Sequence, residues 1–438
     1  MHMGVQGTIL TAATLLAMYG CKGSSTSAPV DAEPSAGGEA PAGVGEVVEA
    51  EPGPSGTAGG AQTPEPSPWG ATQAEQCRRP ARPTMSSKAT RSFSAGVSAA
   101  ASGDAAKAGA EFQRALNRDP RAYPAMYNLG VLADRAGNEQ DALSEYQRAL
   151  TIVPDYEPAV RGMTTIQLRR GQVQAAVASV EPLANRYRSN LELQALYAEI
   201  LVEARRYDEA WMAARRALKC DERFVPALIA LLKASRAQGR DELADSILDQ
   251  ALQVDPNVAE LHFLDGERLK AEPGRLREAM AAYERAVRLR PSYAEAQMAL
   301  GVQLLAGGNY PSALSHFQAA ERLVPTLPAV HVNLGDAYRA NKQWTESQRA
   351  YRRALELQSK LPEAHYGLGL LFLSAAGDFP GLDALTAYEK AVDELNRYRS
   401  EMGPRLAKDD QSEEYLRDLD RMIKRARRQM EREQGGAS

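Results

Sequence analysis

A single residue type recurs at a fixed interval along most of this chain. Alanine returns every 34 residues from Ala108 to Ala244, and the same frame continues, with small shifts in spacing, as far as Ala384. The positions in this frame are Ala108, Ala142, Ala176, Ala210, Ala244, Ala279, Ala313, Ser347 and Ala384. A constant period of this length predicts an array of stacked repeats rather than a single globular core.

Each repeat carries the hydrophobic pattern of two helices. Met126, Leu129 and Ala133 lie three or four residues apart, and Ala142 and Tyr146 begin a second run with the same spacing. Such spacing places the apolar side chains on one face of each helix. A glycine between the two helices indicates the turn, because glycine tolerates the positive φ that ends a helix. These turn glycines are Gly103, Gly137, Gly171, Gly239 and Gly308.

A second set of glycines lies inside the first helix of several repeats, where glycine costs about 1 kcal/mol relative to alanine. We expect the paired helix to approach closely there, with the recurring alanine as the partner. Large residues such as Tyr146 and Tyr351 would then fill the gap between successive hairpins. The helical glycines are Gly96, Gly130, Gly266, Gly301, Gly335 and Gly369.

The repeat frame resembles a known family. The stretch AMYNLGVLADRAGNEQDALSEYQRALTIVPD, which begins at Ala125, is similar to the tetratricopeptide repeat (TPR). This resemblance implies an all-α superhelical solenoid, and we count about nine helix-turn-helix repeats over residues 89–396. Residues 397–438 are interpreted as a linker and an amphipathic capping helix, the helix spanning Glu413 to Gln434.

The N-terminus has a different pattern. A short apolar stretch, Ile9 to Met18, is followed by Gly20 and Cys21. Residues 1–20 resemble a bacterial lipoprotein signal peptide, which implies cleavage after Gly20 and a lipid on Cys21. Lys22 after the cysteine implies the periplasmic face of the outer membrane. The alternative is an uncleaved hydrophobic N-terminus in which the cysteine is incidental.

Residues 21–88 are predicted to be a disordered tether rich in Pro, Gly and Ala. Between Lys22 and Arg78 there are eight acidic residues and no basic ones. Low apolar content with charge of one sign is typical of disorder. Cys77 in this segment and Cys220 in a repeat helix could pair in an oxidising compartment. The long loop between them favours Cys220 as a small packing residue instead.

No catalytic or metal-binding motif is apparent in the sequence, so we expect neither an enzyme nor a cofactor, metal or small-molecule substrate. A formal net charge of −4 gives no general attraction to nucleic acid. A repeat subunit that regulates an enzyme is the remaining enzymatic alternative. It would need a catalytic domain, and the roughly 40 residues after Asn396 are too few for one.

The resemblance to TPR arrays implies a concave groove, lined by the first helices, that binds a helix or an extended segment of another protein. Position in the repeat gives the candidate lining residues. They are Tyr127, Val131, Glu199, Ile229, Lys233, Arg236, Phe263, Glu267, Met298, Val302, Asp336, Arg339 and Tyr366.

The last predicted helix carries a basic patch. Two interpretations stay open: either the positive charge complements the C-terminal end of the helix dipole, or the patch docks to anionic lipid or to an acidic partner. The patch consists of Arg421, Lys424, Arg425, Arg427 and Arg428.

The layout of the whole chain resembles that of TPR lipoproteins of bacterial gliding-motility complexes. The segment RYRSEMGPRLAKDDQ, which precedes the final helix, is the most distinctive part of this likeness. The resemblance implies a scaffold that joins envelope proteins, anchored by a lipid on Cys21. The alternative is a pilotin-like lipoprotein that assists assembly of a secretin or a pilus.

Overall fold

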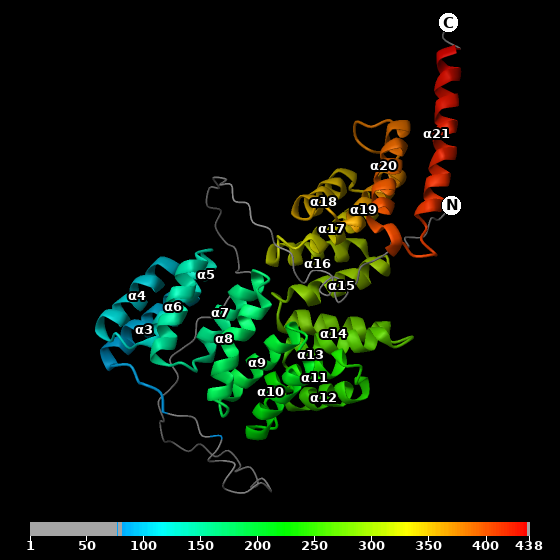
Figure 1. The fold of residues 1–438 in the computed structure, drawn as a ribbon. Coiled ribbons are helices and arrows are strands. Elements are labelled where there is room, and N and C mark those ends of the chain that lie inside the picture. The colour runs from blue at the N-terminus through cyan, green and yellow to red at the C-terminus, as the bar shows by residue number, and fades with distance from the viewer. Residues whose placement is uncertain (1–76, 78–80, 436–438) are drawn as a thin grey trace. The chain divides into compact units, whose positions relative to one another are not determined.

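The computed structural model describes Cys77 and residues 81–435. Within these residues there are 19 α-helices, one short 3-10 helix and no β-strand. Helices α3 to α20 form nine successive hairpins, and α21 follows them (Figure 1). The predicted all-α array of nine repeats is therefore confirmed.

The two helices of a hairpin alternate along the chain. The first helices are α3 (Ser87–Ala101), α5 (Tyr123–Arg135), α7 (Glu157–Arg169), α9 (Leu191–Glu203), α11 (Val225–Ala237), α13 (Ala259–Ala271), α15 (Ala294–Ala306), α17 (Pro328–Ala340) and α19 (Pro362–Ser374). The second helices are α4 (Ala105–Arg118), α6 (Glu139–Ile152), α8 (Val173–Arg186), α10 (Tyr207–Cys220), α12 (Asp241–Val254), α14 (Leu276–Leu289), α16 (Tyr310–Leu323), α18 (Trp344–Leu357) and α20 (Ala384–Met402).

Contacts divide the chain into two compact units between Leu264 and Asp265, inside α13. The N-terminal unit contains the described residues up to Leu264, and the C-terminal unit contains residues 265–435. In each unit the second helix of one hairpin packs against the first helix of the next, as α6 does on α7 and α16 on α17. Within each compact unit, a hairpin thus shares its core with the next hairpin, as the repeat period predicts.

The turns between paired helices have left-handed backbone where glycine was expected. Gly137 has φ of 78° and Gly308 has φ of 80°. In two hairpins a long side chain takes the same conformation, because Arg205 and Lys342 both have φ of 59°. The turn geometry is therefore kept even where the sequence signal is missing.

Five of the six predicted helical glycines make room for an aromatic ring, and Gly369 makes room for Leu395. A β-carbon on Gly130 would lie 2.6 Å from Cε1 of Tyr146, and one on Gly162 in the next hairpin would lie 2.6 Å from Cζ of the same ring. Tyr146 is fully buried between them. The prediction that these large residues fill the space between hairpins is confirmed. The ring is the nearer neighbour of the glycine, and the expected alanine is a second one, because the β-carbon on Gly130 would also lie 3.2 Å from the backbone oxygen of Ala142.

The segment before α3 is fastened to the N-terminal unit. Cys77 forms a disulfide with Cys220, the last residue of α10, across a sequence separation of 143. The guanidinium of Arg82 lies over the ring of Tyr156 at 5.5 Å, and Ser86 caps α3. The interpretation of Cys220 as an unpaired packing residue is therefore wrong. It failed because distance along the chain says little about distance in space once the hairpins stack.

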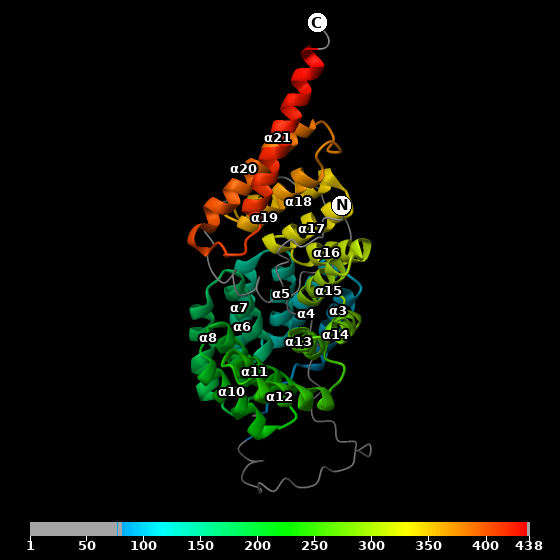
Figure 2. The same cartoon turned by 90° about the vertical axis from the view of Figure 1, so that its right-hand side faces the viewer.

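The C-terminal unit ends in a capping helix. Helix α20 continues to Met402, so the segment expected to be a linker after residue 396 begins as helix. A 3-10 turn, Gly403–Arg405, then leads to α21 (Ser412–Gly435), which packs along α20 (Figures 1 and 2). Leu419 of α21 is fully buried in a cluster with Leu371 and Leu395. Helix α21 therefore covers the apolar side that the ninth hairpin would otherwise leave open.

Among the described residues, every helix is either too short or too polar to cross a bilayer. Cys21 and the whole of residues 1–20 lie outside the described part of the chain, as does most of the predicted tether.

Candidate protein-binding surface

The predicted groove residues separate into two groups in the structure. Seven are buried, with exposed fractions between 0% for Val131 and 9% for Phe263. These seven are Tyr127, Val131, Ile229, Phe263, Met298, Val302 and Tyr366. Their apolar side chains pack inside the array in this structure. Of the predicted apolar and charged lining, only the charged residues are therefore accessible to a partner. The other six are charged residues that stay at least partly accessible.

Tyr127 and Tyr366 show why the apolar candidates are covered. The ring of Tyr127 lies 5.7 Å from the rings of both Tyr146 and Tyr156 in the N-terminal unit. In the C-terminal unit the ring of Tyr366 lies 4.9 Å from that of Tyr398 and 6.4 Å from that of Tyr415. Aromatic side chains on the first helices thus meet aromatic residues of neighbouring elements, an arrangement that the repeat pattern alone does not reveal.

In the N-terminal unit the accessible residues belong to a series of ion pairs that connect successive first helices. Asp134 of α5 pairs with Arg169 of α7. Arg161 of α7 pairs with Glu199 of α9 at 2.9 Å, and it also binds Glu157 of its own helix at 2.6 Å. The first helices of adjacent hairpins are therefore joined by charge as well as by apolar packing.

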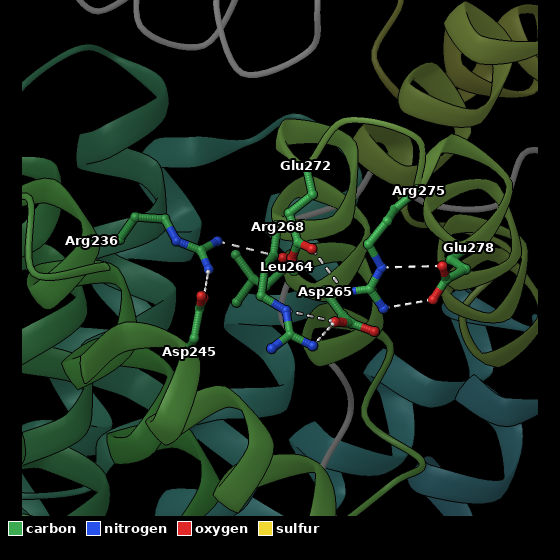
Figure 3. Close-up of polar contacts among 8 residues, drawn as sticks. All are labelled: Arg236, Asp245, Leu264, Asp265, Arg268, Glu272, Arg275 and Glu278. Atoms are coloured by element: carbon green, nitrogen blue, oxygen red, sulfur yellow. Dashed lines mark hydrogen bonds and ion pairs between the residues drawn. The ribbon is translucent and has the colours of Figure 1, made fainter. Parts of the chain in front are cut away.

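The same pattern continues on the following hairpins of this unit. Lys233 of α11 binds Glu260 of α13 at 2.5 Å. Arg236 of α11 donates to Asp245 of α12 at 3.1 Å and to the backbone oxygen of Leu264 at 3.4 Å (Figure 3). We call Glu157, Arg161, Glu199, Glu203, Lys233 and Glu260 the charged first-helix surface.

Partial burial affects the titration of this surface. Burial raises the pKa of Glu157 despite the neighbouring Arg161, and burial also raises the pKa of Glu203 despite Lys233. For Lys233 burial acts in the opposite direction, but Glu260, Glu199 and Glu203 outweigh it and the pKa is raised. Four carboxylates thus share two cations, so acidic side chains outnumber basic ones on this surface by two.

The C-terminal unit holds its accessible first-helix residues by a second arrangement. The hydroxyl of Tyr283 donates to Glu267 at 2.5 Å, and that of Tyr351 donates to Asp336 at 2.7 Å. Each carboxylate also binds a base on its own helix, Lys270 for Glu267. The ring that occupies the core therefore carries a hydroxyl that orients a carboxylate on the first helix.

Arg339 is the third accessible candidate in this unit, and it forms an ion pair with Asp336 at 3.2 Å. Near the start of the unit, Arg268 binds Asp265 at 2.7 Å, and Arg275 lies between Glu272 at 2.9 Å and Glu278 at 2.6 Å (Figure 3). Each of the six accessible candidates is thus held in a defined geometry by an oppositely charged neighbour.

Sequence reasoning missed Glu157, Arg161, Glu203 and Glu260. A usable signal was present, because Arg161 and Glu199 fall on successive first helices with opposite charge. The repeat offset brings such residues together only when the hairpins stack in register. Within the described residues, no group of three or more His, Cys, Asp or Glu side chains is arranged to hold a metal ion.

The basic patch lies on α21 as expected from its sequence. Arg421 pairs with Asp418, Lys424 with Asp420 at 2.6 Å and Arg427 with Glu389 of α20 at 2.8 Å. Arg425 and Arg428 are exposed, and neither forms an ion pair with any described residue.

Comparison with family models agrees with this architecture. Models described as tetratricopeptide repeats match residues 93–157, 135–200 and 268–328, and a model described as a TPR repeat matches residues 335–374. Together with the stacked hairpins, these matches define a repeat scaffold of the TPR class. The chain contains tetratricopeptide repeats over these residues.

One solved structure has a similar fold at low sequence identity, and others resemble parts of the chain. The Cut9–Hcn1 hetero-tetramer of the APC/C contains a chain that is 15% identical, with a TM-score of 0.51 and coverage of 76% of each chain. PilW, described as a type IV pilus biogenesis factor, is 15% identical with a TM-score of 0.41, covering 52% of this chain and 97% of its own. MamA from Desulfovibrio magneticus is 23% identical with a TM-score of 0.35, covering 40% and 96%. No curated protein sequence matches the chain.

Proposed function

We propose that this protein is a lipid-anchored scaffold on the periplasmic face of the outer membrane, where its TPR array binds other envelope proteins. The disulfide between Cys77 and Cys220 supports an oxidising compartment for the protein. Structural disulfides persist in oxidising compartments such as the periplasm and are rare in the cytosol. The lipoprotein-like signal around Cys21 supplies the proposed anchor.

The partner is proposed to bind across the first helices. Five of the six side chains of the charged first-helix surface are held in ion pairs before any partner arrives, which reduces the entropy lost on binding. Its excess of acidic side chains favours a segment that carries lysine or arginine. The resemblance in layout to gliding-motility lipoproteins suggests a motility complex as the assembly in which this occurs.

The anchor is tested by Cys21→Ser in cells. The variant is expected to move from the membrane fraction to the soluble periplasm, and its abundance should not change. Mobility on a non-reducing gel reports in the same sample whether the disulfide has formed. A variant that stays with the outer membrane would remove the lipid anchor from the proposal.

Partner binding is tested with a photo-crosslinking amino acid at Glu199, on the charged first-helix surface. The matched control places it at Met212 of α10, which is 51% exposed in the same unit. Crosslinks to envelope proteins are expected from Glu199 and not from Met212. Identical products from both positions would show that the first helices do not carry the interaction.

The cellular process is tested by deletion. Under this proposal deletion of the chain abolishes gliding and leaves secretin multimers intact, and the Glu199 crosslinks contain motility proteins. Loss of secretin multimers with normal gliding would instead establish the pilotin-like alternative.

A further inference from the structure

Helix α21 carries a straight row of arginines. Arg421, Arg425, Arg428 and Arg432 are separated by four, three and four residues, which places them on one side of an α-helix. With a rise of 1.5 Å per residue the row is about 16 Å long. All four are exposed. We call them the arginine row.

The arginine row faces away from the body of the C-terminal unit. Leu419, Ile423, Ala426 and Met430 repeat the same spacing with an offset of two residues, a rotation of about 200°. Leu419 on that opposite side is buried against α20 and the ninth hairpin. The packing of the apolar side therefore holds the arginines outward. Figures 1 and 2 both show the C-terminal part of α21 extending past α20.

The row has more positive charge than its surroundings neutralise. Residues 421 to 432 contain six basic side chains and one acidic one, Glu431, so this stretch has a net charge of +5. Arg421 is paired with Asp418, but Arg425 and Arg428 have no ion-pair partner among the described residues. Complementing the helix dipole does not account for the row, because the dipole acts only within the last turn.

We propose that the arginine row is a docking surface for anionic phospholipid headgroups. Guanidinium groups bind phosphate with two parallel hydrogen bonds, and a straight row on a convex helix can contact a flat layer of phosphates along its whole length. Each basic residue near an anionic membrane surface adds to the attraction. The contact is made by the arginines at the surface, because Leu416 and Leu419 on the apolar side are packed within the protein. Met430, at the far end of that side, is 42% exposed. The arginine row would be a second membrane contact, independent of a lipid on Cys21.

The experiment uses the purified full chain carrying Cys21→Ser, with its disulfide formed, so that covalent lipid plays no part. Co-sedimentation is measured with vesicles of 30% phosphatidylglycerol and 70% phosphatidylcholine, and with vesicles of phosphatidylcholine alone. Binding is expected only to the first, and it should fall steeply between 50 and 500 mM salt because the arginines are exposed. Binding that is equal for both vesicles would overturn the proposal.

The row is tested directly by the double variant Arg425→Gln and Arg428→Gln. Removal of two arginines should weaken binding to phosphatidylglycerol vesicles roughly tenfold or more. The matched control is Arg349→Gln and Arg352→Gln on α18, which also removes two exposed arginines and should bind as the parent does. Circular dichroism confirms that both variants fold.

Two results would reject the inference. The first is equal vesicle binding by the row variant and the control. The second is tighter binding of the parent to a poly-glutamate peptide than to the anionic vesicles, which would assign the row to an acidic protein instead.

Discussion

The ring of Tyr351 lies so close to Gly367 that a β-carbon on that glycine would stand 2.4 Å from Cε1 of the ring. Tyr351 is fully buried, so the ring cannot move aside without displacing its neighbours. Gly367→Ala should therefore lower the free energy of unfolding by roughly 1–3 kcal/mol. Urea-induced unfolding followed by circular dichroism measures the change.

The control for this substitution is Gly109→Ala in α4. A β-carbon there would meet only Cδ1 of Leu132, at 3.8 Å, which is an ordinary contact. Because alanine is the better helix former, this variant should gain up to about 1 kcal/mol. Similar losses from both substitutions would show that helical glycine is not required by ring packing.

The hydroxyl of Tyr351 is predicted to contribute to the stability of the fold in addition to the ring. It donates to Asp336, whose carboxylate would lose a partner in Tyr351→Phe. A hydrogen bond to a charged group is worth about 1.5–3 kcal/mol, and the loss of stability should fall in or below that range. Chemical denaturation of the variant provides the measurement.

Tyr146→Phe is the matched control, because Tyr146 has the same place in its repeat. Its buried hydroxyl has no hydrogen-bond partner in the described structure. The variant should therefore be as stable as the parent or slightly more stable. A loss equal to that of Tyr351→Phe would contradict the role assigned to Asp336.

The disulfide is expected to stabilise the N-terminal unit. In Cys220→Ser the chain would lose a crosslink that closes a loop of more than 140 residues. A loss of about 2–4 kcal/mol is typical for such a crosslink. The melting temperature should fall to that of the parent measured with a reductant, and reductant should have no further effect on the variant. Cys77→Ser must give the same result if these two cysteines are the pair.

Two carboxylates on successive helices, Glu203 of α9 and Glu209 of α10, should change the stability of the fold with pH in opposite directions. Burial raises the pKa of Glu203 above its ordinary 4.5, so the folded protein binds that proton more tightly than the unfolded chain does. Stability is then greatest below 4.5 and is lost as pH rises through the folded pKa. Glu203→Gln should raise the melting temperature at pH 7 and leave it unchanged at pH 3.

Glu209 is the counterpart. A hydrogen bond from Arg206, at 2.6 Å, lowers the pKa of Glu209 from 4.5. Its contribution is present above 4.5 and is lost as pH falls through the folded pKa. Glu209→Gln should lower the melting temperature at pH 7, and the difference should disappear in acid. Parallel pH profiles for the two variants would refute both assignments.

The capping role of α21 predicts different outcomes at two of its apolar residues. Leu419 is fully buried, and Leu419→Ala should cost about 2–5 kcal/mol in the C-terminal unit. Met430 is 42% exposed near the end of the helix, so Met430→Ala should have little effect. Hydrogen exchange of α19 and α20 would report the loss of the cap, and unchanged exchange in Leu419→Ala would contradict it.

The sequence alone determined the number of hairpins, the turns and the capping helix. These features depend on local rules: apolar spacing gives each helix one face, and a glycine with positive φ ends it. Gly137 and Gly308 follow this rule, and the alanine frame counts nine repeats because each hairpin must bury the same face. Periodicity could not show that Val131 and Met298 are covered, since burial depends on what stacks above them.

Only the tertiary structure decided which distant residues meet. Cys77 and Cys220 are far apart along the chain, and stacking of the hairpins brings them into bonding distance. The same stacking turns Arg161 and Glu199 into a pair and places the ring of Tyr351 against Gly367. A repeat period sets what each hairpin looks like, whereas the rotation from one hairpin to the next sets its contacts. That rotation arises from side-chain packing, which the spacing of residues in the sequence does not record.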